Sequence, residues 1–466
     1  MRVEAFVPEP ADEPLRARAL NRPTGWMEDL DQKRQHVELD GPAPNPFAAR
    51  SAMDHNRPRL VMNDDTVTVG QGSMGNSAMR DVCITGIGST VFGRHRDRSI
   101  QALAIEAAEA AIMRAGIERR QIGALYLGNF IAGPLTGQEV LAGIVADRLG
   151  LSNIPCTKVE GACASGGIAF RHAVLAVQSG MCDAAIAVGV EKMTQVPRED
   201  VTNALLCARD NVEDGDSALT FPGLFGRAWK AYEARYGITR EEVAAVSIKN
   251  KSNGLKNPLA QLGASVTLDT IRQSPMIADP VQLYDCCPVS DGAAAVVVTT
   301  RDLARDAPDL AIDVVASVQT RGAPHLAGHP DLSTFEATVC AAQRAYAAAG
   351  LTARDLDFVE LHDCFSIAEI IDAEDLGIVP RGQGGKWASE GRTAVGGDIA
   401  INPSGGLLSK GHPVGATGVG QIYEAVLQLR GMHGNQVRDA GIGLTHNLGG
   451  VGVACTVNIL RRPDAR

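Results

Sequence analysis

The sequence contains one supersecondary pattern twice, and this repeat limits the folds open to the chain more than any other feature. Residues 107–117 form an alanine-rich run that ends at a glycine and precedes the apolar segment 122–127. Residues 341–351 repeat this run and precede the apolar segment 356–361. Each copy is typical of a helix closed by a glycine, a short linker and a buried strand. The repeat therefore predicts an α/β fold with a duplicated core, built from βα units around a largely parallel sheet.

The chain divides into three regions by composition. Residues 1–78 hold eight of the 23 prolines and little periodicity, which predicts an irregular N-terminal extension. Met79 stands just before the first apolar strand and is an alternative start of the chain. We expect an N-terminal half at 79–307, with a loop insertion at about 195–285, and a C-terminal half at 308–466.

Charge and cysteine usage exclude several classes of protein. The net charge of -10 argues against general binding to nucleic acid or to anionic membranes. The ten cysteines include no Cys-x-x-Cys pair, so neither a zinc ribbon nor a secreted disulfide framework is expected. The acidic, proline-bearing start does not resemble a signal peptide, and a cytoplasmic location is the expectation. Within the insertion, Lys249, Lys251 and Lys256 are candidates to meet a phosphate, although a solvated helix face explains them equally well.

Two glycine-rich segments place a cysteine and a histidine at the starts of predicted helices. Cys163 lies within 161–167 and His412 within 411–416. A thiol at a helix N-terminus feels the positive end of the macrodipole, which favours the thiolate. A histidine within hydrogen-bond reach takes the proton of such a nucleophile. The pair predicts an enzyme that transfers acyl groups.

A second histidine and a second cysteine follow a predicted strand. His362 and Cys364 come directly after the apolar run 358–361, at the carboxyl end where open α/β sheets place their sites. The small residues around Cys163 leave its backbone N–H free to face a carbonyl oxygen, as one half of an oxyanion hole. We therefore expect all four side chains in one pocket.

Seven segments, in the order in which they occur along the chain, resemble the thiolase family, and in particular the thiolase part of sterol-carrier-protein-linked thiolases. The resemblance covers about 80–462 and implies a five-layered αβαβα core made of two repeated halves. The segments are Val159–Gly166, Gly189–Met193, Ser290–Ala294, His362–Ser366, Asn402–Gly406, Gly411–Gly418 and His446–Gly450.

The resemblance also implies a role for each candidate site residue. Cys163 is the nucleophile, and His412 activates it and then polarises the thioester carbonyl. His362 belongs to a second oxyanion hole, and Cys364 carries the proton to and from the α-carbon. Many thiolases take that second cysteine from a Cys-x-Gly segment near the C-terminus, which this chain lacks.

Substrate contacts and assembly follow from the same resemblance. Ser404, Gly405 and His446 are expected to contact coenzyme A, which acts as a co-substrate. No bound cofactor and no metal are expected. The resemblance implies a homodimer or homotetramer, and some relatives depend on a small zinc-ribbon/OB-fold partner subunit.

The predicted activity is cleavage of a 3-oxoacyl-CoA by CoA, or condensation of an acyl-CoA with acetyl-CoA, through an acyl-cysteine. Three alternatives stay open. A decarboxylating ketoacyl synthase shares the fold but usually lacks the second cysteine. A C–C lyase of the aldolase type works without the nucleophilic cysteine. A non-catalytic scaffold subunit would be expected to have lost at least one of the four site residues.

Overall fold

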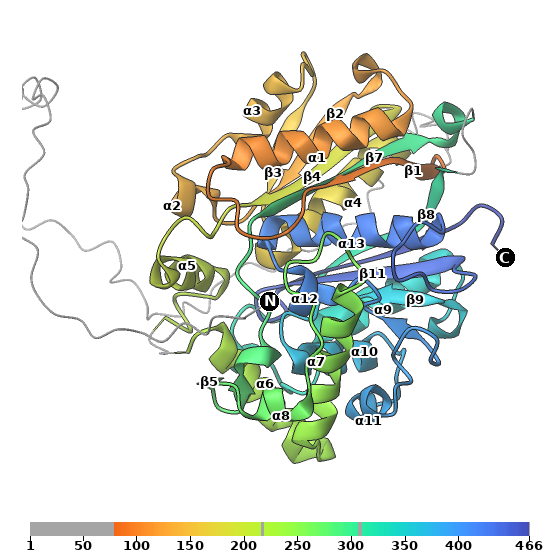
Figure 1. Ribbon diagram of the computed structural model, residues 1–466. Coiled ribbons are helices and arrows are strands. Elements are labelled where there is room, and N and C mark those ends of the chain that lie inside the picture. Colours follow the sequence, from red (N-terminus) through yellow and green to blue (C-terminus); the bar gives the residue numbers. More distant parts are fainter. Residues whose placement is uncertain (1–78, 216–218, 306–309, 466) are drawn as a thin grey trace, which may run out of the picture. The chain divides into compact units, whose positions relative to one another are not determined.

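A computed structural model describes residues 79–215, 219–305 and 310–465, and the predicted extension 1–78 lies outside these ranges. Its main sheet has ten strands in the order β10-β9-β11-β12-β8-β1-β7-β4-β2-β3 (Figure 1). These strands are β1 (Val82–Ser89), β2 (Ala124–Gly128), β3 (Cys156–Val159), β4 (Ala184–Glu191), β7 (Gly292–Thr300), β8 (Ile312–Arg321), β9 (Phe358–Glu360), β10 (Ala400–Ile401), β11 (Ile442–Gly449) and β12 (Ala454–Arg461).

The strand order shows the duplication directly. The run β1-β7-β4-β2-β3 and the run β8-β12-β11-β9-β10 have the same arrangement, and β1 pairs with β8 where they meet. In both runs the outer three strands are parallel and the inner pairings are antiparallel. The sheet is therefore mixed rather than largely parallel as predicted. The physical reason is that β12 returns from β11 through a tight turn, and a strand that follows such a turn must run antiparallel.

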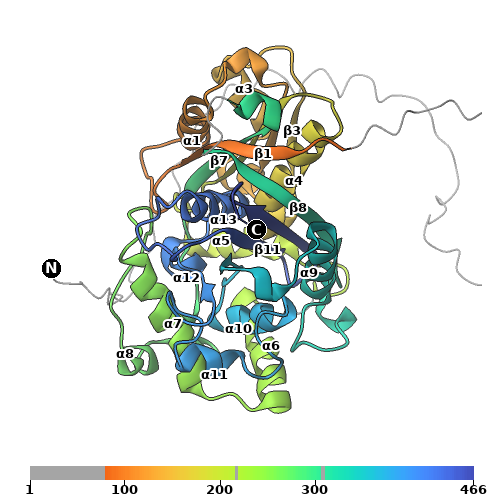
Figure 2. The same cartoon turned by 90° about the vertical axis from the view of Figure 1, so that its right-hand side faces the viewer.

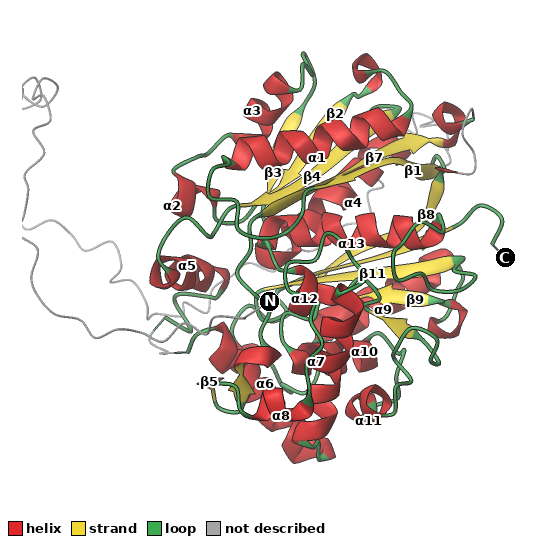
Figure 3. Cartoon of the chain, viewed as in Figure 1, coloured by secondary structure: helices red, strands yellow, loops and turns green. Residues whose placement is uncertain are grey.

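Helices separate and cover the two halves of the sheet (Figures 1 and 3). One long helix covers the outer face of the first half, with the short α3 (Leu141–Arg148) beside it, two lie between the halves, and two cover the outer face of the second half. This is the predicted αβαβα layering, and the α/β fold class is confirmed. The five are α1 (Ile100–Ala115), then α4 (Ser165–Gln178) and α13 (Val414–Leu429), then α9 (Glu336–Ala349) and α10 (Ser366–Asp375).

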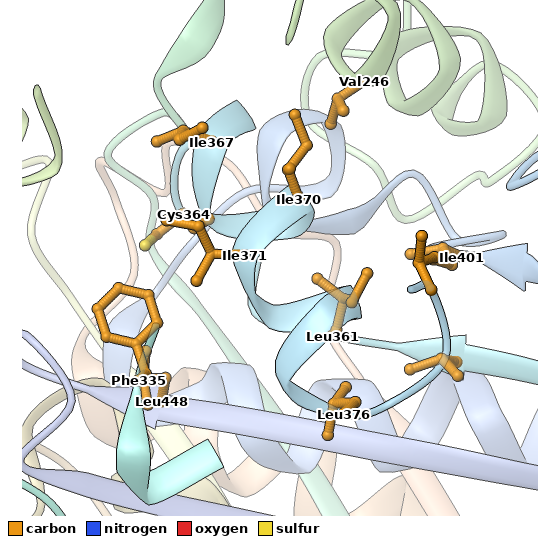
Figure 4. Packing of buried hydrophobic residues seen from close by; sticks show 14 of the residues in the cluster. Val246, Phe335, Leu361, Cys364, Ile367, Ile370, Ile371, Leu376, Ile401 and Leu448 are labelled. Carbon is orange, nitrogen blue, oxygen red and sulfur yellow. The ribbon is translucent and has the colours of Figure 1, made fainter. Parts of the chain in front are cut away.

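The insertion contributes to the core of the second half. Phe225, Trp229 and Val246 belong to the same apolar cluster as Ile367 and Ile370 of α10, and Figure 4 shows Val246 beside Ile370. Figure 2 shows α6 and α7 lying against α10 and α11. The insertion also contains a hairpin of β5 (Met276–Ala278) and β6 (Val281–Gln282). The other α-helices of the described residues are α2 (Ala132–Thr136), α3 (Leu141–Arg148), α5 (Arg198–Leu205), α6 (Phe221–Tyr236), α7 (Arg240–Gly254), α8 (Leu268–Arg272), α11 (Gly384–Ser389) and α12 (Gly406–Lys410).

Two of the three lysines that were candidates to meet a phosphate are used internally. The Nζ of Lys249 pairs with Glu369 at 2.9 Å, and the Nζ of Lys251 donates to the carbonyl of Leu408 at 2.6 Å. Both side chains are buried under α12, and Lys256 donates to an asparagine side chain. The packing of α7 against the second half turns the charges of Lys249 and Lys251 inward, whereas Lys256 is exposed.

A single carboxylate holds the start of β7 to the end of β4. The buried Asp291 accepts hydrogen bonds from the backbone N–H groups of His95, Met193 and Thr194, at 3.0, 2.7 and 2.8 Å. It also accepts from the Thr194 hydroxyl at 2.6 Å and from the Nζ of Lys192 at 3.0 Å. Burial by itself raises the pKa of Asp291, but these hydrogen bonds outweigh it and hold the pKa below its usual range.

We predict that Asp291→Ala lowers the free energy of unfolding by about 3–5 kcal/mol, because the Lys192 charge is left buried without its partner. Urea unfolding at pH 7 measures this. Since the folded pKa of Asp291 is depressed, its contribution is present above the unfolded pKa and is lost as pH falls through the folded pKa. The control is Asp183→Ala, which removes a largely exposed ion pair with Arg80 and costs at most about 1 kcal/mol. Equal losses from the two variants would contradict the prediction.

Candidate active site

The predicted nucleophile lies on a constrained turn at the start of α4. Cys163 is the middle residue of a short helical turn, Ala162–Ala164, that follows β3 and leads into α4. Ala162 has φ +51°, a left-handed conformation that non-glycine residues rarely adopt. The Ser165 hydroxyl holds the turn, since it accepts from Gly161 N–H at 3.0 Å and donates to the Ala162 carbonyl at 2.6 Å. A strained backbone conformation of this kind persists only where the surrounding structure holds it in place. Such conformations are most frequent at functional sites.

Close contact between α4 and α13 brings the cysteine to the histidine. A Cβ atom on Gly166 would lie 2.8 Å from the carbonyl oxygen of Gly415, and one on Gly418 would overlap the backbone of Gly167. Only glycine permits this approach of the two backbones. Because Cys163 and His412 precede these two helices, the contact places both residues at one end of the helix pair.

The structure brings three of the four predicted catalytic residues within reach of one another. The Sγ of Cys163 and one ring nitrogen each of His362 and His412 all lie within 4.8 Å. The two imidazole rings stand nearly perpendicular, at 82°, with centroids 5.0 Å apart. A substrate carbonyl placed against the sulfur would therefore also meet both rings.

Hydrogen bonding shows which nitrogen of His412 carries the proton. Its Nδ1 lies 2.6 Å from the Thr417 hydroxyl, which itself donates to the Pro413 carbonyl at 3.2 Å. The hydroxyl must therefore accept, so His412 is protonated on Nδ1. Its Nε2 is buried and has no hydrogen-bond partner among the described residues. Burial lowers the pKa of His412 to about 3, so the ring is neutral and Nε2 is free to accept a proton.

His362 has the opposite tautomer, and Asn447 determines it. The Asn447 side chain accepts from Gly167 N–H through Oδ1 at 3.2 Å, so its Nδ2 is the donor. That amide donates to the Cys163 carbonyl at 2.9 Å and to Nδ1 of His362 at 3.1 Å. Burial, together with the neighbouring His412, lowers the pKa of His362 well below its usual range. The neutral ring therefore carries its proton on Nε2 and is a hydrogen-bond donor.

The resting thiol is protonated, contrary to the expectation from the helix dipole. Burial raises the pKa of Cys163 to about 12. The backbone N–H groups of Gly450 and of Cys163 itself bond to the sulfur and lower the pKa, but burial outweighs them. Transfer of the proton must therefore accompany attack on a substrate. The Gly450 amide is also a second donor beside the Cys163 amide. Gly450 ends the matching segment His446–Gly450, but the sequence alone indicated no role for it.

Cys364 lies on a loop that is held from two sides. The side chain of the adjacent Asp363 accepts from the backbone N–H of Leu407 at 2.6 Å, and the Cys364 carbonyl accepts from Cys287 N–H at 3.0 Å. Figure 4 shows Cys364 at the edge of the apolar cluster, next to Ile371. Burial raises the pKa of the Cys364 thiol well above its usual range, and the nearby Cys287 and Cys163 thiols raise it further. The thiol is a neutral proton donor close to the nucleophile.

The three residues predicted to contact coenzyme A are buried elsewhere. Ser404 uses its backbone N–H and hydroxyl on the Glu360 carboxylate, at 2.9 and 2.6 Å. Gly405 packs on the backbone of Gly254 in α7. His446 is fully buried behind His362. Each segment matched a motif, and the packing of α7 and β11 directs these groups into the interior. Their contact with coenzyme A stays a prediction.

The cluster of one thiol and two imidazoles has the donor types of a zinc site. The tautomers do not suit a metal, however. The lone pair of His362 Nδ1 is occupied by the Asn447 amide, so Nε2 carries the proton and the ring has no lone pair to offer a metal. Of the three groups, only Cys163 and His412 have electron pairs to offer, and the donor set fits proton transfer better than metal binding.

Comparison with known proteins identifies the family. The sequence pattern described as "Thiolase, N-terminal domain" matches residues 81–302, and "Thiolase C-terminal domain-like" matches residues 319–462. An acetyl-CoA acetyltransferase of Methanothermobacter thermautotrophicus is 46% identical over 82% of this chain and 100% of its own length. A second acetyl-CoA acetyltransferase, of Methanocaldococcus jannaschii, is 39% identical over 82% of this chain and 99% of its own. Bovine sterol carrier protein 2 is 33% identical over 82% of this chain and 73% of its own.

Solved structures agree on the fold. An Ltp2-ChsH2(DUF35) aldolase superposes with a TM-score of 0.72 at 24% identity, covering 83% of this chain and 99% of that chain. Human mitochondrial 3-ketoacyl-CoA thiolase in complex with CoA gives a TM-score of 0.65 at 18% identity, covering 83% of this chain and 98% of that chain. With matches over both halves and with relatives aligned over most of their length, this chain belongs to the thiolase family of acyltransferases.

Proposed function

We propose that this thiolase moves an acyl group between a 3-oxoacyl-CoA and CoA through an acyl-Cys163 intermediate, and that it also catalyses the reverse condensation. The observation that carries the proposal is the grouping of a thiol, a proton acceptor on His412 and a proton donor on His362 within 4.8 Å. The names of the two archaeal relatives support acetyl-CoA as one product and acetoacetyl-CoA as the substrate to test first.

Cleavage begins with proton transfer and attack in one step. The Nε2 of His412 takes the proton of Cys163 while the sulfur adds to the 3-keto carbonyl of the substrate. The backbone N–H groups of Cys163 and Gly450 hold the oxyanion that forms. The bond between C2 and C3 then breaks, and its electron pair stays on C2 as the enolate of acetyl-CoA. His362 Nε2–H and the newly protonated His412 Nε2–H stabilise the enolate oxygen.

Cys364 completes the first half-reaction by giving its proton to C2, which releases acetyl-CoA. The Cys364 thiolate then takes the proton of an incoming CoA thiol. The CoA sulfur attacks the acyl group, Cys163 departs as the thiolate, and His412 returns its proton. All four residues end in their starting states, so no oxidant or bound cofactor is required by this scheme.

The alternatives fit the site less well. A decarboxylating synthase needs no acid at C2, yet Cys364 is present and buried beside Cys163. An aldolase needs no nucleophile, yet Cys163 has a free base and two backbone amides facing it. The likeness to the Ltp2-ChsH2(DUF35) aldolase concerns the fold. A scaffold role does not account for the opposite tautomers of His362 and His412, one a proton donor and the other a proton acceptor.

We extend the proposal to assembly and location. The edge strands β3 and β10 each have one unpaired side within the described sheet, which supports a homodimer or homotetramer formed by strand pairing. A small zinc-ribbon/OB-fold partner is proposed because the aldolase above was solved with a DUF35 subunit. Among the described helices, none is long and apolar enough to cross a membrane. A cytoplasmic location and a role in fatty acid β-oxidation complete the proposal.

We predict that Cys163→Ala abolishes thiolysis of acetoacetyl-CoA, and that Cys364→Ala lowers kcat roughly 10²–10⁴-fold, because the acid at C2 is lost. The release of acetyl-CoA measures both. Intact-protein mass spectrometry should still detect acetylation of Cys163 in the Cys364 variant after incubation with acetyl-CoA. The exposed Cys207 supplies the control variant Cys207→Ala, which keeps full activity. Full activity of Cys163→Ala would refute the acyl-enzyme.

We predict that Asn447→Asp lowers kcat about 10²–10³-fold with little change in KM, because one transition-state donor is removed. The aspartate can still accept from Gly167 N–H, but it cannot donate to Nδ1 of His362. That nitrogen then takes the ring proton, and Nε2 loses it. Steady-state kinetics with acetoacetyl-CoA tests this, and circular dichroism confirms that the variant is folded. A kcat equal to that of the wild type would contradict the assigned tautomer.

We predict that alkylation of Cys163 by iodoacetamide accelerates about tenfold per pH unit between pH 7 and 10, since only the thiolate reacts and its pKa is about 12. Labelling of the Cys163 peptide, followed by mass spectrometry at each pH, measures the rate. A plateau below pH 9 would show that the resting nucleophile is already a thiolate.

A further inference from the structure

Two consecutive residues of β11 hold His362 at two different points. The Asn447 amide bonds to the His362 ring, as described above. The preceding residue, His446, accepts the backbone N–H of His362 on its Nδ1, at 3.4 Å. The ring and the main chain of this donor are therefore both tied to one strand.

His446 is the first member of a buried chain of hydrogen bonds. Its Nε2 lies 3.0 Å from the hydroxyl of Thr338 near the start of α9. The Thr338 hydroxyl donates to Oδ1 of Asp372 on α10 at 3.0 Å. His446, Thr338 and Asp372 are each fully buried. This series of hydrogen bonds therefore joins the loop after β9 to β11, α9 and α10.

The direction of the chain follows from the donors available. Nδ1 of His446 accepts a backbone N–H, so it carries no proton. Burial lowers the pKa of His446 to about 3, so the neutral ring is protonated on Nε2 and donates to Thr338. The Thr338 hydroxyl in turn donates a hydrogen bond to Asp372. Burial raises the pKa of Asp372 well above its usual range, and its Oδ2 has no partner among the described residues, so Oδ1 serves as a neutral acceptor.

We propose that Thr338, through His446, positions the His362 main chain so that the His362 donor keeps its place opposite Cys163, with Asp372 as the final acceptor. This rests on the proposed thiolase function. Thr338, His446 and Asp372 are positioning residues, since none contacts the reacting atoms. Apolar side chains in place of Thr338, His446 and Asp372 would avoid the free-energy cost of burying three polar groups. The polar groups are explained if they hold the loop after β9 in one conformation.

The test compares Thr338→Val, which keeps the shape and removes the hydroxyl, with Thr338→Ser, which restores it. We expect Thr338→Val to lower kcat for acetoacetyl-CoA thiolysis at least fivefold with KM unchanged within twofold. Thr338→Ser should stay within twofold of the wild type. Equal activity of the valine variant and the wild type would overturn the proposal, and so would a serine variant as impaired as the valine one.

A double-mutant cycle separates positioning of His362 from a general effect on the fold. In the His362→Ala background, Thr338→Val should cause no further loss of kcat, because the group it positions is already absent. The same fivefold loss in that background would overturn the proposal.

A measurement on the wild-type protein does not depend on the folding of a variant or on its activity. ¹⁵N-histidine NMR, with the His446 signals assigned through His446→Gln, should show His446 neutral and protonated on Nε2. Protonation on Nδ1 would overturn the chain of hydrogen bonds even in an active enzyme. A wild-type protein inactive on acetoacetyl-CoA, with this tautomer observed, would instead count against the proposed function alone.

Discussion

The contact between the glycine-rich ends of α4 and α13 is the constraint on which the rest of the site depends. The backbones at Gly166 and Gly415 approach so closely that a Cβ would lie 2.8 Å from a carbonyl oxygen. Each helix belongs to a different half of the duplicated core. Their contact therefore joins the halves at the point where Cys163 and His412 begin the two helices. A side chain on either helix at this point would separate the nucleophile from its base.

The duplication was used asymmetrically. The first half contributes the nucleophile, whereas His362, Cys364 and His412 all come from the second half. The equivalent strands β2 and β9 show the difference, because only the loop after β9 has the histidine and the second thiol. A single site at the junction of the halves thus receives Cys163 from one copy, and both histidines and the second thiol from the other.

Neutrality is the electrostatic principle of the site. Burial lowers the pKa of both histidines and raises the pKa of both thiols, so no resting group is charged. A hydrogen bond from His412 to Thr417 and one from Asn447 to His362 then give the two rings opposite tautomers, so that one Nε2 is an acceptor and the other a donor. Charge develops only when a substrate carbonyl is present to receive it, and the backbone amides and the His362 Nε2–H are the donors available to hold it.

The sequence by itself determined the α/β class and the duplication and proposed four candidate catalytic side chains, because these depend on local periodicity and on short motifs. It did not reveal which way the motif residues face. Ser404 and His446 stand in matching segments, yet the structure buries them against Glu360 and Thr338. Asn447 and Gly450 stand in the matching segment His446–Gly450, but the segment did not reveal their roles, because these depend on partners about 85 and 287 residues away, at His362 and Cys163. The pKa of the nucleophile was likewise decided by tertiary structure, since burial by distant segments outweighs the dipole of its own helix.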